Sequence, residues 1–288
     1  MMKSFVLLLL VVLAITANAD VIRDSIRIDG NYRTFQFVRP ATKRANASLV
    51  FVLHGSGGSG KDMMASTGKL IESTASENVL IVYPDGYKRY WNECRKAASS
   101  LANKLDIDEA AFFGGMIEYF RSKYIIDTKQ VFSVGTSGGG HMCYKLALTM
   151  PTQFKAIAAI IANLPDTDNL DCLEAKVPLP VMIVNGTEDP LNKYGGGMMR
   201  SGDFIMGNVR STEKTFRYWS DLAGYKGEPQ KILLPDNDPK DGKTIERYSF
   251  KAQGKPEVVL LKVIGGKHDY PNDIDVHVEA WNFFKRQR

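Results

Sequence analysis

Val131-Phe132-Ser133-Val134-Gly135-Thr136-Ser137-Gly138-Gly139 is the most informative segment of the chain. Its first four residues have the composition of a buried strand, and the residues that follow, up to Met150, have that of a helix ending before Pro151. A strand that runs through Gly-x-Ser-x-Gly into a helix is typical of a nucleophile elbow, where only small residues fit at the outer turn positions. We therefore predict that Ser137 is exposed at the carboxyl end of a strand, beside the positive end of a helix.

The rest of the chain indicates the α/β class. Apolar runs typical of strands buried on both faces occupy residues 49–53, 79–83, 131–134, 181–184 and 258–263. Helical patterns occupy residues 61–76, 106–124, 137–150, 212–222 and 274–286. Residues 21–28 and 32–38 alternate polar and apolar side chains around Asp29-Gly30-Asn31, which predicts an antiparallel hairpin. We expect a mostly parallel central sheet with this hairpin as its antiparallel N-terminal edge and with helices on both faces.

Two segments interrupt this alternation. Residues 191–209 contain Gly195-Gly196-Gly197 followed by several Met and Phe residues, which fits either a loop bordering the functional site or an ordinary surface insertion. Residues 235–243 form a polar turn that we expect at the tip of a hairpin.

The N-terminal residues have the layout of a secretory signal peptide. Lys3 precedes an apolar stretch at residues 5–15 and then Ala17-Asn18-Ala19, which predicts a signal peptide over residues 1–19. Eleven apolar residues are too few to cross a bilayer core of ~30 Å, so no membrane anchor is expected. Residues 20–288 are then a single exported domain, either secreted or periplasmic. The formal charge of +5 at pH 7 is not gathered into a basic patch with interleaved aromatic residues, which argues against nucleic acid as a partner.

The chain has three cysteines, Cys94, Cys143 and Cys172. In an oxidising compartment they form one disulfide and leave one free thiol, or none is bridged. Cys143 lies on the predicted helix behind Ser137 and is expected to be a buried apolar residue, so Cys94 and Cys172, in predicted loops, are the favoured pair. Their wide spacing does not indicate a zinc site, and no metal is expected.

A serine nucleophile needs a general base and an acid that orients it, and in sheets of this kind the order along the chain is serine, acid, histidine. Of the four histidines, His268 and His277 occur in that order. His268 follows the strand at 258–263 in a glycine-containing loop and is the favoured base, whereas His277 is expected at the surface of the last helix. Asp189 follows the strand at 181–184 and is the favoured acid. Its neighbour Glu188 is the rival, and a simple turn is the structural alternative for both.

Attack on an ester carbonyl creates an oxyanion that two N–H donors must stabilise. We expect one donor to be the Gly138 amide and the other to be the amide of Ser56 or Gly57, in the loop His54-Gly55-Ser56-Gly57-Gly58-Ser59. His54 is expected to brace this loop. The loop lacks the Gly-Lys-Ser/Thr ending of a phosphate-binding loop.

Several motifs occur together in an order that resembles a known family. They are His54-Gly55-Ser56-Gly57-Gly58, Trp91-Asn92 with Cys94, Gly135-Thr136-Ser137-Gly138-Gly139-Gly140, Asn185-Gly186-Thr187-Glu188-Asp189-Pro190 and Gly265-Gly266-Lys267-His268. The chain is similar to secreted α/β-hydrolases of the poly(3-hydroxybutyrate) depolymerase-like and feruloyl/acetylxylan esterase group, carbohydrate esterase family 1. The resemblance implies Ser137 as nucleophile, Asp189 as acid and His268 as base, acting on esters without a cofactor.

The chain departs from this family at two positions near the predicted site. The family has Asn or Ala where Gly138 stands, which leaves the backbone amide in place, and Trp-Pro where Tyr270-Pro271 stands, which changes the pocket. Tyr270 is therefore a candidate for the pocket rim. Tyr90 and Trp91 are candidates for stacking on a sugar or a phenolic acyl group, although a buried Trp91 that holds its loop fits equally well.

The sequence thus predicts a secreted serine carboxylic-ester hydrolase that forms an acyl-enzyme on Ser137. Its expected substrates are feruloyl or acetyl esters of plant cell-wall polysaccharide, or hydroxyalkanoate esters, polymeric ones included. Two alternatives remain open: a serine peptidase of the same fold, and a non-catalytic polysaccharide-binding protein on a hydrolase scaffold.

Overall fold

The computed structural model describes residues 20–40 and 45–288, so the predicted signal peptide at 1–19 lies outside the described residues. The strands are β1 (Val21–Ile28), β2 (Asn31–Val38), β3 (Ala47–Leu53), β4 (Val79–Pro84), β5 (Ile126–Thr136), β6 (Ala156–Ile160), β7 (Val181–Gly186), β8 (Gly197–Ser201), β9 (Phe204–Val209), β10 (Gln230–Leu233), β11 (Thr244–Phe250) and β12 (Val258–Ile264). The helices are α1 (Gly60–Ser66), α2 (Gly68–Thr74), α3 (Leu101–Lys104), α4 (Glu109–Tyr124), α5 (Gly138–Thr149), α6 (Thr212–Leu222) and α7 (Val276–Lys285), with a 3-10 turn at Thr167–Asn169.

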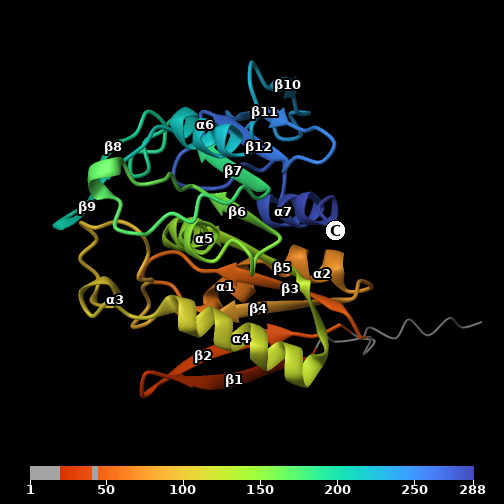
Figure 1. Ribbon diagram of the computed structural model, residues 1–288. Helices are drawn as coiled ribbons and strands as arrows, with labels where there is room; N and C mark the ends of the chain where they lie inside the picture. Colours follow the sequence, from red (N-terminus) through yellow and green to blue (C-terminus); the bar gives the residue numbers. More distant parts are fainter. Residues whose placement is uncertain (1–19, 41–44) are drawn as a thin grey trace, which may run out of the picture.

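Ten strands form one sheet in the order β1-β2-β4-β3-β5-β6-β7-β12-β11-β10 (Figure 1). The six central strands from β4 to β12 run parallel, whereas β1 and β2 at one edge and β11 and β10 at the other pair antiparallel. The α/β fold with an antiparallel N-terminal edge is therefore confirmed. The second antiparallel edge places residues 235–243 at the tip of the β10–β11 hairpin, as expected.

Helices cover both faces of this sheet because its central strands are apolar on both sides. In β3, Leu49, Phe51 and Leu53 belong to the core shared with α4, α5 and α6. Val50 and Val52 point the other way, into the core shared with α1, α2 and α7. Among the described helices, none is long and apolar enough to cross a membrane.

The secondary structure differs from the sequence prediction in several places, which also include helix α3 and the β8–β9 hairpin. The helix expected at 61–76 is two helices, because Thr67 leaves the helical conformation and its hydroxyl bonds to the Met63 carbonyl at 2.9 Å. The helix expected from residue 106 begins at Glu109, after Asp108 caps its N-terminus. Strand β6 was not predicted, since its Ala-Ile-Ala-Ala-Ile sequence has a weak strand propensity and becomes a strand through its burial between β5 and β7.

Candidate active site

Ser137 lies in the sharp turn between β5 and α5. Its backbone has φ +53° and ψ −115°, a conformation that costs on the order of 1–3 kcal/mol and persists only where neighbours enforce it. The Ser137 amide donates to the Ile160 carbonyl at the end of β6, at 2.8 Å. A Cβ at Gly135 would collide with the Gly139 carbonyl, and a Cβ at Gly139 with the Leu53 carbonyl, so the glycines permit the turn.

The structure brings Asp189, His268 and Ser137 into one hydrogen-bonded chain. Nδ1 of His268 is 2.7 Å from Oδ2 of Asp189, and its Nε2 is 3.0 Å from Oγ of Ser137. The three residues follow β7, β12 and β5, so all stand at the carboxyl ends of parallel strands. The Asp189 side chain is fully buried, whereas the His268 side chain is 25% exposed and faces the pocket.

Backbone contacts fix the acid and the histidine relative to each other. The Glu188 amide donates to the Gly266 carbonyl at 2.8 Å, and the Gly265 amide donates to the Thr187 hydroxyl at 2.9 Å. The other carboxylate oxygen of Asp189 accepts the Leu191 and Asn192 amides, both at 2.8 Å. Asp189 therefore has one oxygen held by backbone and one oxygen free for the histidine.

The glycine loop after β3 lies against the start of α5. A Cβ at Gly138 would come within 2.9 Å of the Ser56 backbone nitrogen, so the Ser56 and Gly138 amides are close neighbours. The Gly138 amide belongs to the first turn of α5, where N–H groups have no partner within the helix. The Gly57 amide instead donates to the Arg89 carbonyl at 2.9 Å. Of the two amides that the sequence left open, that of Gly57 is bonded to Arg89, and Ser56 is the residue of the two that lines the pocket.

His54 braces this loop. Its Nδ1 is 2.7 Å from the Gly55 carbonyl, and its Nε2 accepts the Gly86 amide at 2.9 Å. This pair of contacts places the ring proton on Nδ1. Burial lowers the pKa of His54, which keeps the ring neutral.

A pocket of about 410 Å³ opens beside Ser137. Its lining residues are Ser56, Tyr90, Trp91, Glu93, Arg95, Ala98, Ser99, Ser100, Asn103, Ser137, Gly138, Leu191, Met199, Ser201, Phe204, Met206 and His268. Trp91 lines this pocket and also holds the glycine loop after β3 in place. Its side chain is 3% exposed, and its indole N–H donates to the His54 carbonyl at 2.9 Å. The segment 191–209 contributes Leu191 and the β8–β9 hairpin to this pocket, so it borders the site. No group of three His, Cys, Asp or Glu side chains suited to a metal ion occurs in residues 20–40 and 45–288.

Two aromatic residues lie elsewhere than the sequence predicted. Tyr270 is not among the pocket residues, and its hydroxyl is 2.7 Å from the hydroxyl of Thr136, behind the elbow. His277 is buried rather than exposed, because α7 turns its first residues toward the sheet, where the ring packs edge-on against Tyr270. Burial lowers the pKa of His277 to about 4, so this ring is neutral.

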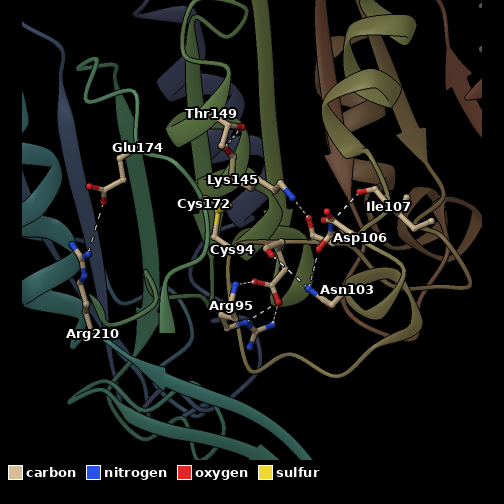
Figure 2. Close-up of a disulfide and its surroundings, with 12 residues drawn as sticks. Cys94, Arg95, Asn103, Asp106, Ile107, Lys145, Thr149, Cys172, Glu174 and Arg210 are labelled. Atoms are coloured by element: carbon tan, nitrogen blue, oxygen red, sulfur yellow. Dashed lines mark hydrogen bonds and ion pairs between the residues drawn. A yellow bond between two sulfur atoms is a disulfide. The ribbon is translucent and has the colours of Figure 1, made fainter. Parts of the chain in front are cut away.

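The structure joins Cys94 to Cys172 by a disulfide and leaves Cys143 buried as a free thiol (Figure 2). The residue after Cys94 is Arg95, which lines the pocket together with Glu93. The sequence prediction did not include this charged pair, because an acidic and a basic residue two positions apart are typical of an exposed loop. The sequence feature that could have indicated their place in the pocket is their position next to Trp91 and on either side of Cys94.

No family model matches the chain. Feruloyl esterase B of Piromyces equi is 27% identical over 165 residues, covering 57% of this chain and 29% of that protein. Feruloyl esterase C of Emericella nidulans is 25% identical over 166 residues, covering 56% of this chain and 55% of that protein. The chain is therefore similar in sequence to the feruloyl esterases over a little more than half of its length.

A protein named as an esterase, NocK of Nocardia uniformis subsp. tsuyamanensis, is 24% identical over 230 residues, covering 77% of this chain and 65% of NocK. The chain thus spans less than two thirds of the length of each of these three relatives. Among solved structures, the acetyl xylan esterase from Aspergillus awamori superimposes with a TM-score of 0.57 at 14% identity, covering 91% of this chain and 99% of that chain. This similarity identifies the fold as that of an α/β-hydrolase.

Proposed function

We propose that this chain is a serine carboxylic-ester hydrolase, with Ser137 as nucleophile, His268 as general base and Asp189 as the acid that orients it. The observation that carries the proposal is the chain of two hydrogen bonds, 2.7 Å and 3.0 Å, that ends on the hydroxyl of a serine held in an elbow. This arrangement suits nucleophilic catalysis, since a serine hydroxyl reacts only when a base takes its proton.

In the first half-reaction, Oγ of Ser137 attacks the ester carbonyl carbon while Nε2 of His268 accepts the hydroxyl proton. Asp189 accepts the Nδ1–H hydrogen bond, which fixes the tautomer and stabilises the imidazolium. The Gly138 and Ser56 amides donate to the oxyanion. His268 then returns the proton to the leaving alcohol, and the acyl group stays on Ser137.

In the second half-reaction, water takes the place of the alcohol. His268 removes one proton from this water, the hydroxide attacks the acyl carbon, and the oxyanion again forms between the two amides. Collapse of the intermediate releases the carboxylic acid and returns the proton to Ser137. The cycle uses no metal and no cofactor.

The proposed substrates of this chain are feruloyl or acetyl esters of plant polysaccharide, or hydroxyalkanoate esters, with Tyr90 and Trp91 at the binding surface. The feruloyl esterases that resemble the chain support the feruloyl esters among these. We further propose that residues 20–288 act as one exported catalytic domain, secreted or periplasmic. The disulfide between Cys94 and Cys172 supports this, because such bonds persist in oxidising compartments.

The test is hydrolysis of p-nitrophenyl acetate and p-nitrophenyl butyrate by residues 20–288, beside the Ser137→Ala variant. The proposal expects turnover by the unmodified protein and none above background by the variant. A folded protein that turns over neither ester, but cleaves peptide p-nitroanilides or only binds polysaccharide, would support one of the two alternatives instead.

A further inference from the structure

Glu93 and Arg95 form a buried ion pair inside the pocket that contains Ser137. Nη2 of Arg95 is 2.7 Å from Oε1 of Glu93, its Nε donates to the same oxygen at 2.8 Å, and the Arg95 amide donates to Oε2 at 2.9 Å. Both side chains are only 4% exposed. Such a pair is rarely a net gain in stability, because desolvating two charges costs about as much as their attraction returns.

The position of this pair is fixed by the covalent and hydrogen-bonded structure around it. Cys94, between the two residues, is bonded to Cys172, and Figure 2 shows Arg95 beside this disulfide. Arg95 also forms an isolated β-bridge with Leu170, and the next amide, that of Lys96, donates to the Asn169 carbonyl at 2.7 Å. The guanidinium is therefore held rigidly, as a specific binding group must be.

Several N–H donors of the Arg95 guanidinium have no oxygen acceptor among the described residues. A guanidinium carries five N–H groups, and here Glu93 is its one oxygen acceptor among the described residues. Nη1 contacts only the Met199 sulfur, at 3.4 Å, and a thioether is a weak acceptor. A buried donor without a good acceptor is costly, so a ligand oxygen at this place would be favoured.

The charge balance of the pair determines which kind of oxygen fits. Glu93 already compensates the positive charge of Arg95, so a ligand carboxylate would add a second negative charge beside Glu93 in a poorly solvated site. A neutral hydroxyl or ether oxygen adds no charge and still accepts the hydrogen bond. The same pocket is also lined by the aromatic side chains of Tyr90, Trp91 and Phe204, which suit an aromatic ring.

We propose that Arg95, held in place by Glu93, is a specificity-determining residue that donates a hydrogen bond to a neutral hydroxyl or methoxy oxygen on the aromatic ring of the acyl group. The inference rests on the proposed esterase function and deepens it. Arg95 selects among acyl groups by this contact and takes no part in the bond-making steps at Ser137.

The test compares two methyl esters that share their leaving group. Methyl 4-hydroxy-3-methoxycinnamate carries the ring oxygens, and methyl cinnamate lacks them. The unmodified protein should prefer the oxygenated ester by about tenfold to a hundredfold in kcat/KM. The double variant Glu93→Gln/Arg95→Met, which removes both charges together, should lose this preference, so that its kcat/KM values for the two esters lie within about threefold of each other. Methyl 4-carboxycinnamate should be the poorest substrate of the unmodified protein.

A second buried pair supplies the matched control. Arg33 and Glu109 form an ion pair at 2.9 Å with side chains 4% and 0% exposed, and neither lines the pocket of Ser137. The variant Arg33→Met/Glu109→Gln should keep the full preference, which separates a pocket effect from the general effect of removing a buried pair.

The outcomes separate the two proposals. Equal kcat/KM for the two cinnamates in the unmodified protein would overturn the role of Arg95, even if the double variant does not fold. That role is overturned as well if the double variant keeps the preference, or if the carboxylated ester is the best substrate. Failure of the esterase proposal itself has a different signature, in which no ester is hydrolysed and no acyl group is found on Ser137.

Discussion

Replacing Asp189 with Asn should abolish most of the activity while leaving the fold intact. Oδ1 of Asp189 accepts two backbone N–H groups at 2.8 Å, and Oδ2 accepts from Nδ1 of His268 at 2.7 Å. In the Asn variant the amide oxygen must stay with the two N–H donors, because turning the NH2 group toward them would leave buried donors unpaired at about 1–3 kcal/mol each. The NH2 group then faces His268 and needs Nδ1 as an acceptor.

A His268 ring that accepts at Nδ1 carries its proton on Nε2 and cannot take the proton of Ser137. We expect kcat for p-nitrophenyl acetate to fall roughly 10⁴-fold, equivalent to about 5 kcal/mol of transition-state stabilisation. Thermal unfolding should confirm that the variant folds. The matched control is Glu188→Gln, the exposed neighbour, which should keep kcat within about twofold. Retention of more than a tenth of the activity by Asp189→Asn would refute the assigned role of the acid.

Three further changes have expected results. Although the family that the chain resembles has Asn or Ala at this position, Gly138→Ala should lower kcat here by up to about 10²–10³-fold, because in this chain its Cβ would lie 2.5 Å from Oγ and 2.9 Å from the backbone nitrogen of Ser56 and displace an oxyanion donor. The Cys94→Ser/Cys172→Ser variant opens a link between residues 78 apart and should lose about 4 kcal/mol of unfolding free energy in urea titrations. The pKa of His277, about 4 in the fold, lies below its unfolded value, so its protonation should destabilise the protein as pH falls from about 6.5 to 4. Between pH 7.5 and 4.5, urea titrations of His277→Gln should therefore show about 2–3 kcal/mol less destabilisation than the unmodified protein.

Each of these has a control and a contrary outcome. Gly68→Ala, where a Cβ meets nothing within 4 Å, should leave kcat unchanged, and an equally active Gly138→Ala would mean that Ser56 is not a donor. The control for the disulfide is Cys143→Ala, which removes the free thiol. Reduction of the Cys94–Cys172 disulfide in this variant should still lower the free energy of unfolding. Acid destabilisation of the same size in His277→Gln as in the unmodified protein would show that this ring is not the group that titrates.

The parts of the fold that could be predicted are those in which a local sequence pattern is compatible with one structure only. The apolar runs of β3 and β12 need burial on both faces, and the Gly-x-Ser-x-Gly turn fits only between a strand and a helix. Because the parallel strands end at one edge, the order of Ser137, Asp189 and His268 along the chain was enough to expect them together, and the structure places them within hydrogen-bonding distance.

The parts that escaped prediction depend on tertiary contacts. His277 has the sequence context of a surface residue on an amphipathic helix, and only the packing of the first turn of α7 on the sheet buries it. Tyr270 lies two residues after His268, yet the loop directs its hydroxyl behind the elbow to Thr136. The burial of Glu93 and Arg95 results from the disulfide and the bridge to Leu170, which join segments far apart in the sequence.

The most direct test of Ser137 as the nucleophile is reaction of the protein with a fluorophosphonate, followed by mass spectrometry of its peptides. We predict a single covalent adduct on Ser137, formed much more slowly in His268→Ala and absent in Ser137→Ala. A folded, unlabelled protein, or an adduct on another serine such as Ser56, would contradict the assignment of Ser137 as the nucleophile.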